Sequence, residues 1–323
     1  MHLRRITLRS ALRGFGMQRA IEQVLRSETR HRSRTARPDV GWLQVNVSLA
    51  RRDDSAVQSA RALLRTLEAA LPGWRRAGVV RCFFFQRKPP DLRLRFQCAG
   101  EGVLSRLRPV MSRMKADGHV LRSFRSVYEP EQRQFGGREC MRYIHEYWAA
   151  DSMTWLALDR RIEADEFRTS HPSLMAAILN DVFWRTLGDG GEVWDTWRNV
   201  LDLLHGDAAD GVPRSDPITL DALTGDAREV ELDILVRCRD ANARLAAALL
   251  RTWERGRMTS GMRSILPYVA LFTLNRHGFD QANAAAMARS MAAAWDPKAR
   301  MRGSMPDPPT WARRIARAID AGR

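Results

Sequence analysis

Two strand-like runs joined by a proline turn constrain the fold of this chain more than any other feature. Residues 79–86 are mostly apolar, and residues 92–98 (LRLRFQC) begin with the strict apolar and polar alternation of a β-strand. Between them, residues 87–91 (RKPPD) contain two consecutive prolines, which cannot donate backbone hydrogen bonds and favour a turn. The sequence therefore predicts an antiparallel hairpin within a larger sheet.

The segments on either side of this hairpin complete a known order of elements. Residues 42–49 (WLQVNVSL) alternate like a strand, and residues 119–128 are predicted to form another. Helices are predicted at residues 55–71, ending at Pro72-Gly73, and at residues 102–116. The order β-α-β-β-α-β is that of a ferredoxin-like unit, an antiparallel sheet with two helices on one face.

The pattern becomes helical after Gly136-Gly137. Further helices are predicted at residues 138–164, 172–187, 191–205, 229–255, 260–276, 281–295 and 309–318. Residues 206–226, rich in Asp, Gly and Pro, are predicted to form a surface loop. We therefore expect an α+β fold, with a ferredoxin-like βαββαβ sheet over residues 41–135 and a helical part over residues 136–323.

The net charge of the chain is large, but its distribution argues against a nucleic-acid partner. The formal net charge is +16, and residues 1–40, a predicted basic extension, contain ten arginines against three acids. The rest of the excess is dispersed and lacks the aromatic-interleaved basic stripe of a single-strand binder. No apolar run approaches the roughly 20 residues that span a bilayer, so we expect a cytoplasmic protein without a membrane partner.

The cysteines give no sign of a metal site or a disulfide framework. Cys82, Cys98, Cys140 and Cys238 show neither CxxC nor Cys/His ligand spacing. The chain also lacks a GxGxxG after a strand, a P-loop, GxSxG, HExxH and the kinase motifs. We therefore expect no metal and no cofactor, and a site dominated by cations.

Arginines of the hairpin form the first candidate site. Period-2 alternation places Arg93 and Arg95 on one sheet face, together with Asn46, while Arg87 and Lys88 close the preceding strand. Two guanidiniums side by side repel each other unless an anion lies between them, and a bidentate carboxylate fits that position. The alternative is a solvated sheet face whose arginines pair with local acids.

A second candidate site follows the last predicted strand. Tyr128 and Glu131 precede Gly136-Gly137, and paired glycines allow the backbone to approach a ligand at a helix N-terminus. Glu131 is a candidate partner of the hairpin arginines or a candidate acid-base group. The alternative is a turn followed by a helix cap.

The predicted helices supply the remaining candidates. His145 and Ser152 lie seven residues apart and therefore on one helix face, and His145 has a pKa suited to proton transfer. Asn275, Arg276 and His277 form the polar end of an apolar helix. The alternatives are a structural histidine and a C-terminal cap.

Five segments in order then carry a resemblance to a known family. They are residues 42–49 (WLQVNVSL), 83–96 (FFFQRKPPDLRLRF), 128–137 (YEPEQRQFGG), 141–152 (MRYIHEYWAADS) and 271–278 (LFTLNRHG). Together they resemble the thiopeptide-type bacteriocin biosynthesis proteins, which are related to the C-terminal elimination domain of lantibiotic dehydratases.

The resemblance implies a cofactor-free enzyme that matures a ribosomally made precursor peptide carrying a leader. One branch of the family eliminates glutamate from glutamylated Ser or Thr, and we expect this reaction. Another joins two dehydroalanines into a pyridine by a formal [4+2] cyclisation and expels the leader. For elimination, Arg87, Arg93 and Arg95 would bind the glutamyl carboxylates, and a separate tRNA-dependent glutamylating dehydratase would be a partner. A homodimer is also compatible with the sequence.

One departure from the family concerns the general base. Many relatives carry a histidine just before the Asn-Arg pair, whereas Leu271, Phe272, Thr273 and Leu274 precede Asn275 here. A non-catalytic partner that binds the leader through the sheet is the alternative that this loss favours. The expected catalytic residues are Arg93, Arg95, Glu131, His145 and His277. The expected substrate-binding residues are Asn46, Arg87, Lys88, Tyr128, Ser152, Asn275 and Arg276.

Overall fold

The computed structural model describes residues 41–52, 54–98, 102–206, 216–225 and 227–300. The first elements are β1 (Trp42–Leu49), α2 (Val57–Arg76), β2 (Val80–Lys88), β3 (Asp91–Cys98), α3 (Gly102–Ala116) and β4 (Val120–Ser126). The helices that follow are α4 (Arg138–Glu163), α5 (His171–Leu187), α6 (Gly190–Leu203), α7 (Leu220–Gly225), α8 (Glu229–Glu254), α9 (Met262–Arg276), α10 (Gln281–Ala294) and α11 (Pro297–Arg300). The predicted α+β fold, a βαββαβ sheet followed by a helical part, is confirmed.

Two predicted segments, the extension over residues 1–40 and the helix over residues 309–318, lie outside the described residues. Within the described ranges, no helix has the length and apolar character needed to cross a membrane.

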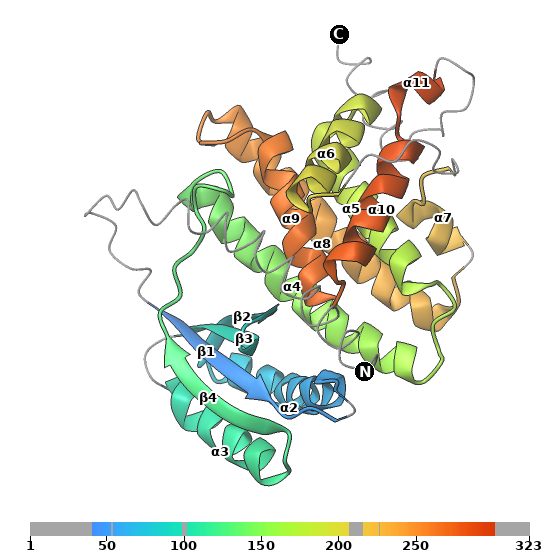
Figure 1. The fold of residues 1–323 in the computed structure, drawn as a ribbon. Coiled ribbons are helices and arrows are strands. Elements are labelled where there is room, and N and C mark those ends of the chain that lie inside the picture. Colours follow the sequence, from blue (N-terminus) through green and yellow to red (C-terminus); the bar gives the residue numbers. More distant parts are fainter. Residues whose placement is uncertain (1–40, 53, 99–101, 207–215, 226, 301–323) are drawn as a thin grey trace, which may run out of the picture.

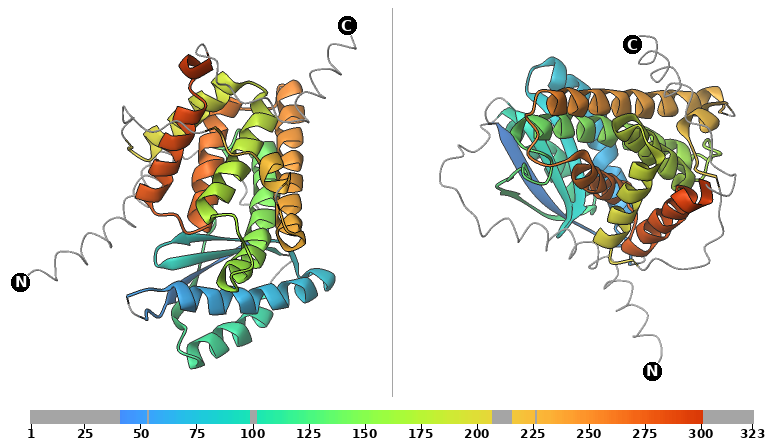
Figure 2. Two further views of the ribbon diagram at one scale, coloured as in Figure 1. Left: turned by 90° about the vertical axis from the view of Figure 1, so that its right-hand side faces the viewer. Right: turned by 90° about the horizontal axis from the view of Figure 1, so that it is seen from above.

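The strands form one antiparallel sheet in the order β2-β3-β1-β4. Helices α2 and α3 lie against one face, and the helical part lies against the other (Figures 1 and 2). Across β1 and β3, Gln44 is opposite Arg95 and Asn46 is opposite Arg93. Directly paired residues present their side chains on the same face, so the prediction that both arginines share a face with Asn46 is confirmed.

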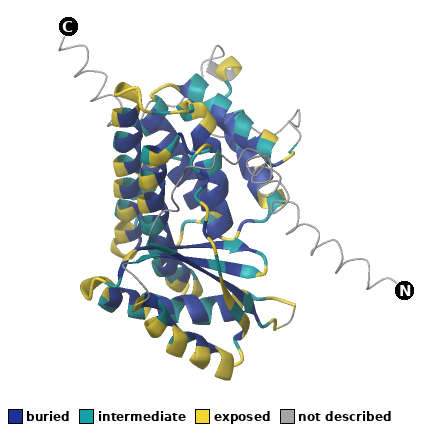
Figure 3. Cartoon of the chain, turned by 90° about the vertical axis from the view of Figure 1, so that its left-hand side faces the viewer, coloured by how far each residue is buried: buried dark blue, intermediate teal, exposed yellow. Residues whose placement is uncertain are grey.

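The other face of the sheet is apolar, which explains why α2 and α3 cover it. Val45, Val47, Leu92, Leu94 and Phe96 are all buried. They are covered by apolar helix side chains, namely Leu63, Leu64, Leu67, Leu71 and Trp74 of α2 and Val103, Leu107, Met111 and Met114 of α3. Each large aliphatic or aromatic side chain buried in this way contributes about 1.5–3 kcal/mol. The outer side of α3 remains exposed (Figure 3).

Two local predictions are wrong for reasons of packing. The first helix does not end at Pro72-Gly73, because α2 continues to Arg76. Trp74 is buried with its ring centroid 6.3 Å from that of Phe96, so burial against the sheet outweighs the helix-breaking tendency of the proline. Residues 206–226 are not all loop either, because α7 forms where Leu220 is buried.

The hairpin turn is also shorter than predicted. Lys88 pairs with Asp91 across the two strands, which leaves only Pro89 and Pro90 in the turn. Arg87 is opposite Leu92 and therefore faces α2, whereas Lys88 faces the helical part.

An aromatic stack joins the sheet to the helical part. The Trp148 ring of α4 is parallel to that of Phe272 of α9, with centroids 4.9 Å apart. The ring centroid of Phe84 of β2 lies 5.1 Å from that of the same tryptophan. The Phe135 ring packs edge-on against it, also with centroids 5.1 Å apart. The polar face of β2 and β3 is consequently covered by α4 and α9 rather than solvated.

Candidate functional site

A continuous network of polar side chains lies on the sheet face beneath α4. The Nε atom of Arg95 donates to Oε1 of Gln44 at 2.8 Å. The amide of Gln44 donates to Asn46 at 3.2 Å and to the Ser126 hydroxyl at 2.7 Å, and Asn46 donates to the same hydroxyl at 2.8 Å. These residues, with Tyr128 and His145, are called the sheet-face cluster below.

Arg95 is the charged centre of the sheet-face cluster. Its side chain is only 2% exposed, and its guanidinium lies 4.2 Å from the ring centre of Tyr128 and 5.3 Å from that of Phe84. Among the described residues no carboxylate pairs with it, and its buried Nη1 atom has no hydrogen-bond partner. A desolvated cation without a counterion strongly favours the binding of an anion.

The histidine of the sheet-face cluster is held neutral. Its Nε2 atom lies 2.7 Å from the hydroxyl of Tyr128. Burial, and secondarily the charge of Arg95, lowers the pKa of His145 to about 3. A neutral imidazole has one N–H and one nitrogen with a free lone pair. In the tautomer whose Nε2–H donates to the Tyr128 hydroxyl, Nδ1 keeps the lone pair that can accept a proton.

His145 lies at the wall of a cavity of about 610 Å³. Its ring centroid lies 4.5 Å from that of Trp42, which lines the same cavity. The other lining residues are Gln97, Arg138, Glu139, Met141, Arg142 and Arg257. The cavity therefore brings solvent, and any ligand of peptide size, to the edge of the sheet-face cluster.

Two other predicted site residues, Arg93 and Lys88, lie on the same sheet face. Arg93 is half-buried and donates from Nε to the Pro89 carbonyl at 3.1 Å. Lys88 is buried, with Nζ 5.0 Å from the ring centre of Phe272. Glu131 is 4% exposed, and its Oε2 atom accepts no hydrogen bond from the described residues.

The paired glycines after Glu131 approach protein, not an open ligand site. Gly136 and Gly137 have φ values of +76° and +100°. A side chain on Gly136 would come within 2.6 Å of Ile265, and one on Gly137 within 3.2 Å of Thr259. The glycines thus allow the start of α4 to pack against α9 and the segment before it, which corrects the ligand role considered from the sequence.

A second cluster, the Asp151 cluster, joins α4, α5 and α9. Nε of Arg276 donates to Oδ2 of Asp151 at 2.6 Å, and Nε2 of His277 lies 3.0 Å from Oδ1. The other ring nitrogen of His277 lies 3.2 Å from Nε2 of His171. Burial acts to raise the pKa of Asp151, but Arg276 and His277 outweigh it and hold this pKa below its usual value. The carboxylate is therefore ionised and already fully paired.

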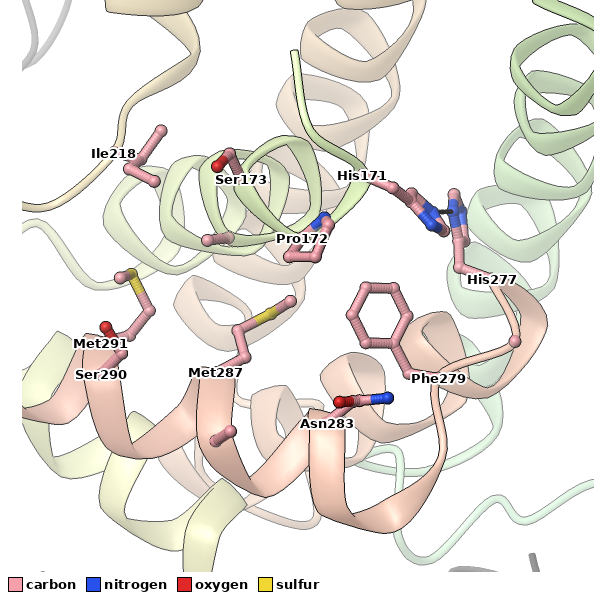
Figure 4. Close-up of a pocket in the computed structure, with 13 residues that line it drawn as sticks. His171, Pro172, Ser173, Ile218, His277, Phe279, Asn283, Met287, Ser290 and Met291 are labelled. Atoms are coloured by element: carbon pink, nitrogen blue, oxygen red, sulfur yellow. Dashed lines mark hydrogen bonds between the residues drawn. The ribbon is translucent and has the colours of Figure 1, made fainter. Parts of the chain in front are cut away.

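The two histidines of the Asp151 cluster line a cavity of about 500 Å³ between α5, α9 and α10. Figure 4 shows His171 and His277 meeting at one end of this cavity, with Phe279, Met287 and Met291 along its length. Burial, then the charges of His277 and Arg87, lowers the pKa of His171 to about 3.

The end of β2 is anchored by the Asn-Arg-His segment. The side-chain amide of Asn275 accepts from the backbone N–H of Arg87 at 3.0 Å and donates to its carbonyl at 2.8 Å. Nε of Arg87 donates to the Arg276 carbonyl at 3.0 Å, and Ser152 accepts from the Phe85 N–H at 3.4 Å. The side chains of this segment thus bind β2 and α4 instead of capping their own helix.

The structure therefore divides the predicted site residues into two groups. Arg95, Asn46, Tyr128 and His145 meet in the sheet-face cluster, with Arg93 on the same face. Arg87, Asn275, Arg276 and His277 lie together elsewhere, and Arg87 does not share a site with Arg93 and Arg95. His171 was not predicted, because a histidine at a helix start gives no local sign of a partner 106 residues away.

Comparisons with known proteins identify the family. The family model described as the C-terminal part of lantibiotic biosynthesis dehydratases matches residues 42–295. The crystal structure of the tRNA dependent lantibiotic dehydratase MibB from Microbispora sp. 107891 superposes with a TM-score of 0.64 at 17% identity, covering 84% of this chain and 29% of that one. The crystal structure of TsrL superposes with a TM-score of 0.50 at 16% identity, covering 82% of this chain and 98% of that one.

These two structures share the fold of this chain at low sequence identity, and the chain spans less than a third of MibB. No curated protein matches the sequence. Because the family model covers most of the chain, including both clusters, the chain belongs to the lantibiotic dehydratase C-terminal family.

Proposed function

We propose that this protein removes glutamate from glutamylated Ser or Thr residues of a precursor peptide, leaving a dehydroamino acid. The observation that carries the proposal is Arg95, a buried guanidinium with no acidic partner among the described residues and a buried N–H that bonds nothing. A glutamyl carboxylate is an anion of the size and charge that such a group binds. The elimination also requires no cofactor.

In this proposal the sheet-face cluster removes the α-proton and stabilises the negative charge of the departing glutamate. A base removes the α-proton of the modified residue, and that electron pair forms the Cα=Cβ bond. The bond from Cβ to the glutamyl ester oxygen breaks, and glutamate departs as a carboxylate. Arg95, assisted by Arg93, stabilises the negative charge that develops on the departing acid.

We assign the base to His145 rather than His277. His145 lines the 610 Å³ cavity and is hydrogen-bonded by one ring nitrogen to Tyr128. His277 has both ring nitrogens engaged, one by Asp151 and one by His171. Burial is the main cause that lowers the pKa of His145, and the charge of Arg95 is the second. A glutamyl carboxylate beside Arg95 would offset the second cause and so raise this pKa when the substrate is bound.

The substrate must be supplied already glutamylated. MibB is described as a tRNA dependent lantibiotic dehydratase, and by analogy we propose a tRNA-dependent glutamylating dehydratase as the partner that supplies this substrate. The cavity of about 610 Å³ beside His145 is lined by Arg138, Arg142 and Arg257 and by Glu139, which Arg257 approaches at 3.4 Å. Cationic side chains in its wall suit an acylated, acidic peptide.

The test uses glutamylated precursor peptide and mass spectrometry. We expect loss of one glutamate per modified residue with the natural protein, and no loss with Arg95→Gln. Arg160→Gln is the matched control, because Arg160 lies on α4 but pairs with Glu68 at the surface. An unchanged mass with the natural protein would reject elimination, and leader release with a pyridine chromophore would establish cyclisation instead. Peptide binding without any mass change would favour a non-catalytic leader-binding partner.

A further inference from the structure

A third, smaller cavity of about 230 Å³ lies on the α2 side of the hairpin end. It is lined by Val57, Arg61, Leu64, Arg65, Arg87, Trp155, Leu156, Asp159, His277 and Gly278. It shares His277 and Gly278 with the 500 Å³ cavity, but it shares no lining residue with the 610 Å³ cavity beside His145. We call it the Arg87 pocket.

Two of the three arginines in the Arg87 pocket are neutralised. Nε and Nη2 of Arg61 donate to the carboxylate of Asp159 at 2.9–3.1 Å. Arg65 pairs with Glu163, and Arg61 also approaches that glutamate at 3.6 Å. Three arginines therefore face two carboxylates, which leaves one positive charge in excess.

The excess charge belongs to Arg87. No carboxylate among the described residues lies within ion-pair distance of it, and its Nε atom bonds the Arg276 carbonyl. Its guanidinium lies 5.7 Å from the ring centre of Trp155 and 5.9 Å from that of Phe85. Burial lowers the pKa of Arg87 to about 10, and the nearby charge of Asp159 offsets only part of this effect.

The wall beside Arg87 is suited to a hydrogen-bonding ligand. His277 lines the pocket and is held in place by Asp151 and His171. Gly278, at φ +82°, passes the guanidinium closely, since a side chain there would start 3.5 Å from Nε. Without that side chain, the face of the arginine toward the pocket stays open.

We propose that the Arg87 pocket is a second anion site, which binds a carboxylate as the missing counterion of Arg87. The planar guanidinium matches a carboxylate in geometry, and one excess charge calls for a monoanion rather than a phosphate dianion. A volume of 230 Å³ equals about eight waters at roughly 30 Å³ each, enough for a small organic acid or an acidic side chain. This site is separate from the sheet-face cluster and does not rest on the proposed elimination.

The direct test compares butyrate with butyramide, which differ in charge but hardly in shape. The imidazole signals of His171 and His277 are followed by NMR in the full-length protein, without precursor peptide. We expect butyrate to shift both signals saturably and to bind at least tenfold more tightly than butyramide. Equal effects of the two compounds would overturn the proposal. Since no elimination is measured, the outcome is independent of the proposed function.

Two further arms identify the source of the carboxylate. L-Glutamate represents a free acid, and a glutamyl tripeptide blocked at both ends represents a carboxylate carried by a peptide. A free-acid site binds the first better, and a peptide site binds the second better. If neither displaces butyrate, the butyrate signal does not report a carboxylate site and the proposal fails.

Variants test whether Arg87 is the binding group. Arg87→Gln should abolish the butyrate shifts, Arg87→Lys should retain part of them, and the surface control Arg160→Gln should leave them unchanged. Should Arg87→Gln not fold, the natural protein can be modified with phenylglyoxal and mapped by mass spectrometry. Butyrate should then protect Arg87 several-fold and leave Arg237, a surface residue of α8 paired with Asp233, unprotected. Lack of protection at Arg87 would contradict the proposal.

Discussion

The sheet-face cluster and the Asp151 cluster each contain a buried arginine, but among the described residues only the arginine of the Asp151 cluster has an acidic partner. Arg276 is fully buried and donates to the ionised carboxylate of Asp151. Arg95 is 2% exposed, and among the described residues it donates to the neutral amide of Gln44 and lies over aromatic rings, with no acidic partner. A fold depends on a buried ion pair remaining intact, because the loss of one partner leaves an uncompensated charge, whereas a buried cation without an acid can have its charge offset by a ligand. We therefore propose a structural role for the Asp151 cluster and an anion-binding role for the sheet-face cluster.

The largest expected effect is on stability, at the Asp151 cluster. Arg276→Ala leaves a buried carboxylate without its main partner and should lower the free energy of unfolding by about 3–5 kcal/mol. Urea denaturation measures this loss. The double variant Asp151→Leu/Arg276→Leu should be less destabilised than Arg276→Ala, because it leaves no unpaired charge. A loss below about 1 kcal/mol for Arg276→Ala would mean that the two clusters do not differ as described.

Arg95→Gln should show the opposite pattern. Elimination should slow by about 10²–10³-fold, the usual effect of removing one group that stabilises developing negative charge. The free energy of unfolding should fall by no more than about 1 kcal/mol, since no buried acid loses a partner. Steady-state elimination rates and urea denaturation give the two numbers. A stable variant with full activity would remove Arg95 from the site.

The pH dependence of the free energy of unfolding tests whether His145 is buried and neutral or exposed to solvent. His145 has a pKa of about 3 in the fold and about 6.5 when unfolded, so between these values only the unfolded chain takes up the proton. Stability must therefore fall as pH decreases through this window, by up to about 1.4 kcal/mol per pH unit for this group. His145→Gln should remove that part of the slope between pH 6 and pH 4 in urea titrations, while His171 retains its own. An unaltered slope would show that His145 is solvated in the native protein.

The smallest expected effect on stability comes from supplying the missing acid. Gln44→Glu places a carboxylate at the atom that Arg95 already contacts at 2.8 Å. The free energy of unfolding should rise by about 1 kcal/mol, as a charged hydrogen bond replaces a neutral acceptor. Elimination should nevertheless be lost, because the internal carboxylate competes with the substrate. Retained activity together with higher stability would show that the anion binds elsewhere.

The parts of the fold and of the candidate site that could be predicted from the sequence are those whose contacting residues lie close together in the chain. The period-2 alternation was enough to place Arg93 and Arg95 on one sheet face, because strand geometry fixes that relation within a strand. Asn46 shares their face through the register of β1 with β3. The resemblance grouped Arg87 with these two arginines, but its pairing with Leu92 puts it on the opposite face, because the register of the hairpin decides which face each residue takes. No local pattern shows that Asp151 bonds His277, since 126 residues separate them and only the packing of α4 against α9 brings them together.

The aromatic stack between the two clusters links their energies. The Arg95 guanidinium lies over Phe84, Phe84 contacts Trp148, and the Arg276 guanidinium lies 5.5 Å from the ring centre of Trp148. The charge of Arg95 is one of the influences that lower the pKa of Arg276. An anion bound at Arg95 therefore also relieves repulsion felt by Arg276, so ligand occupancy and the melting temperature should rise together. Binding of the proposed anion at Arg95 should therefore also stabilise the packing of the sheet against the helices that cover it.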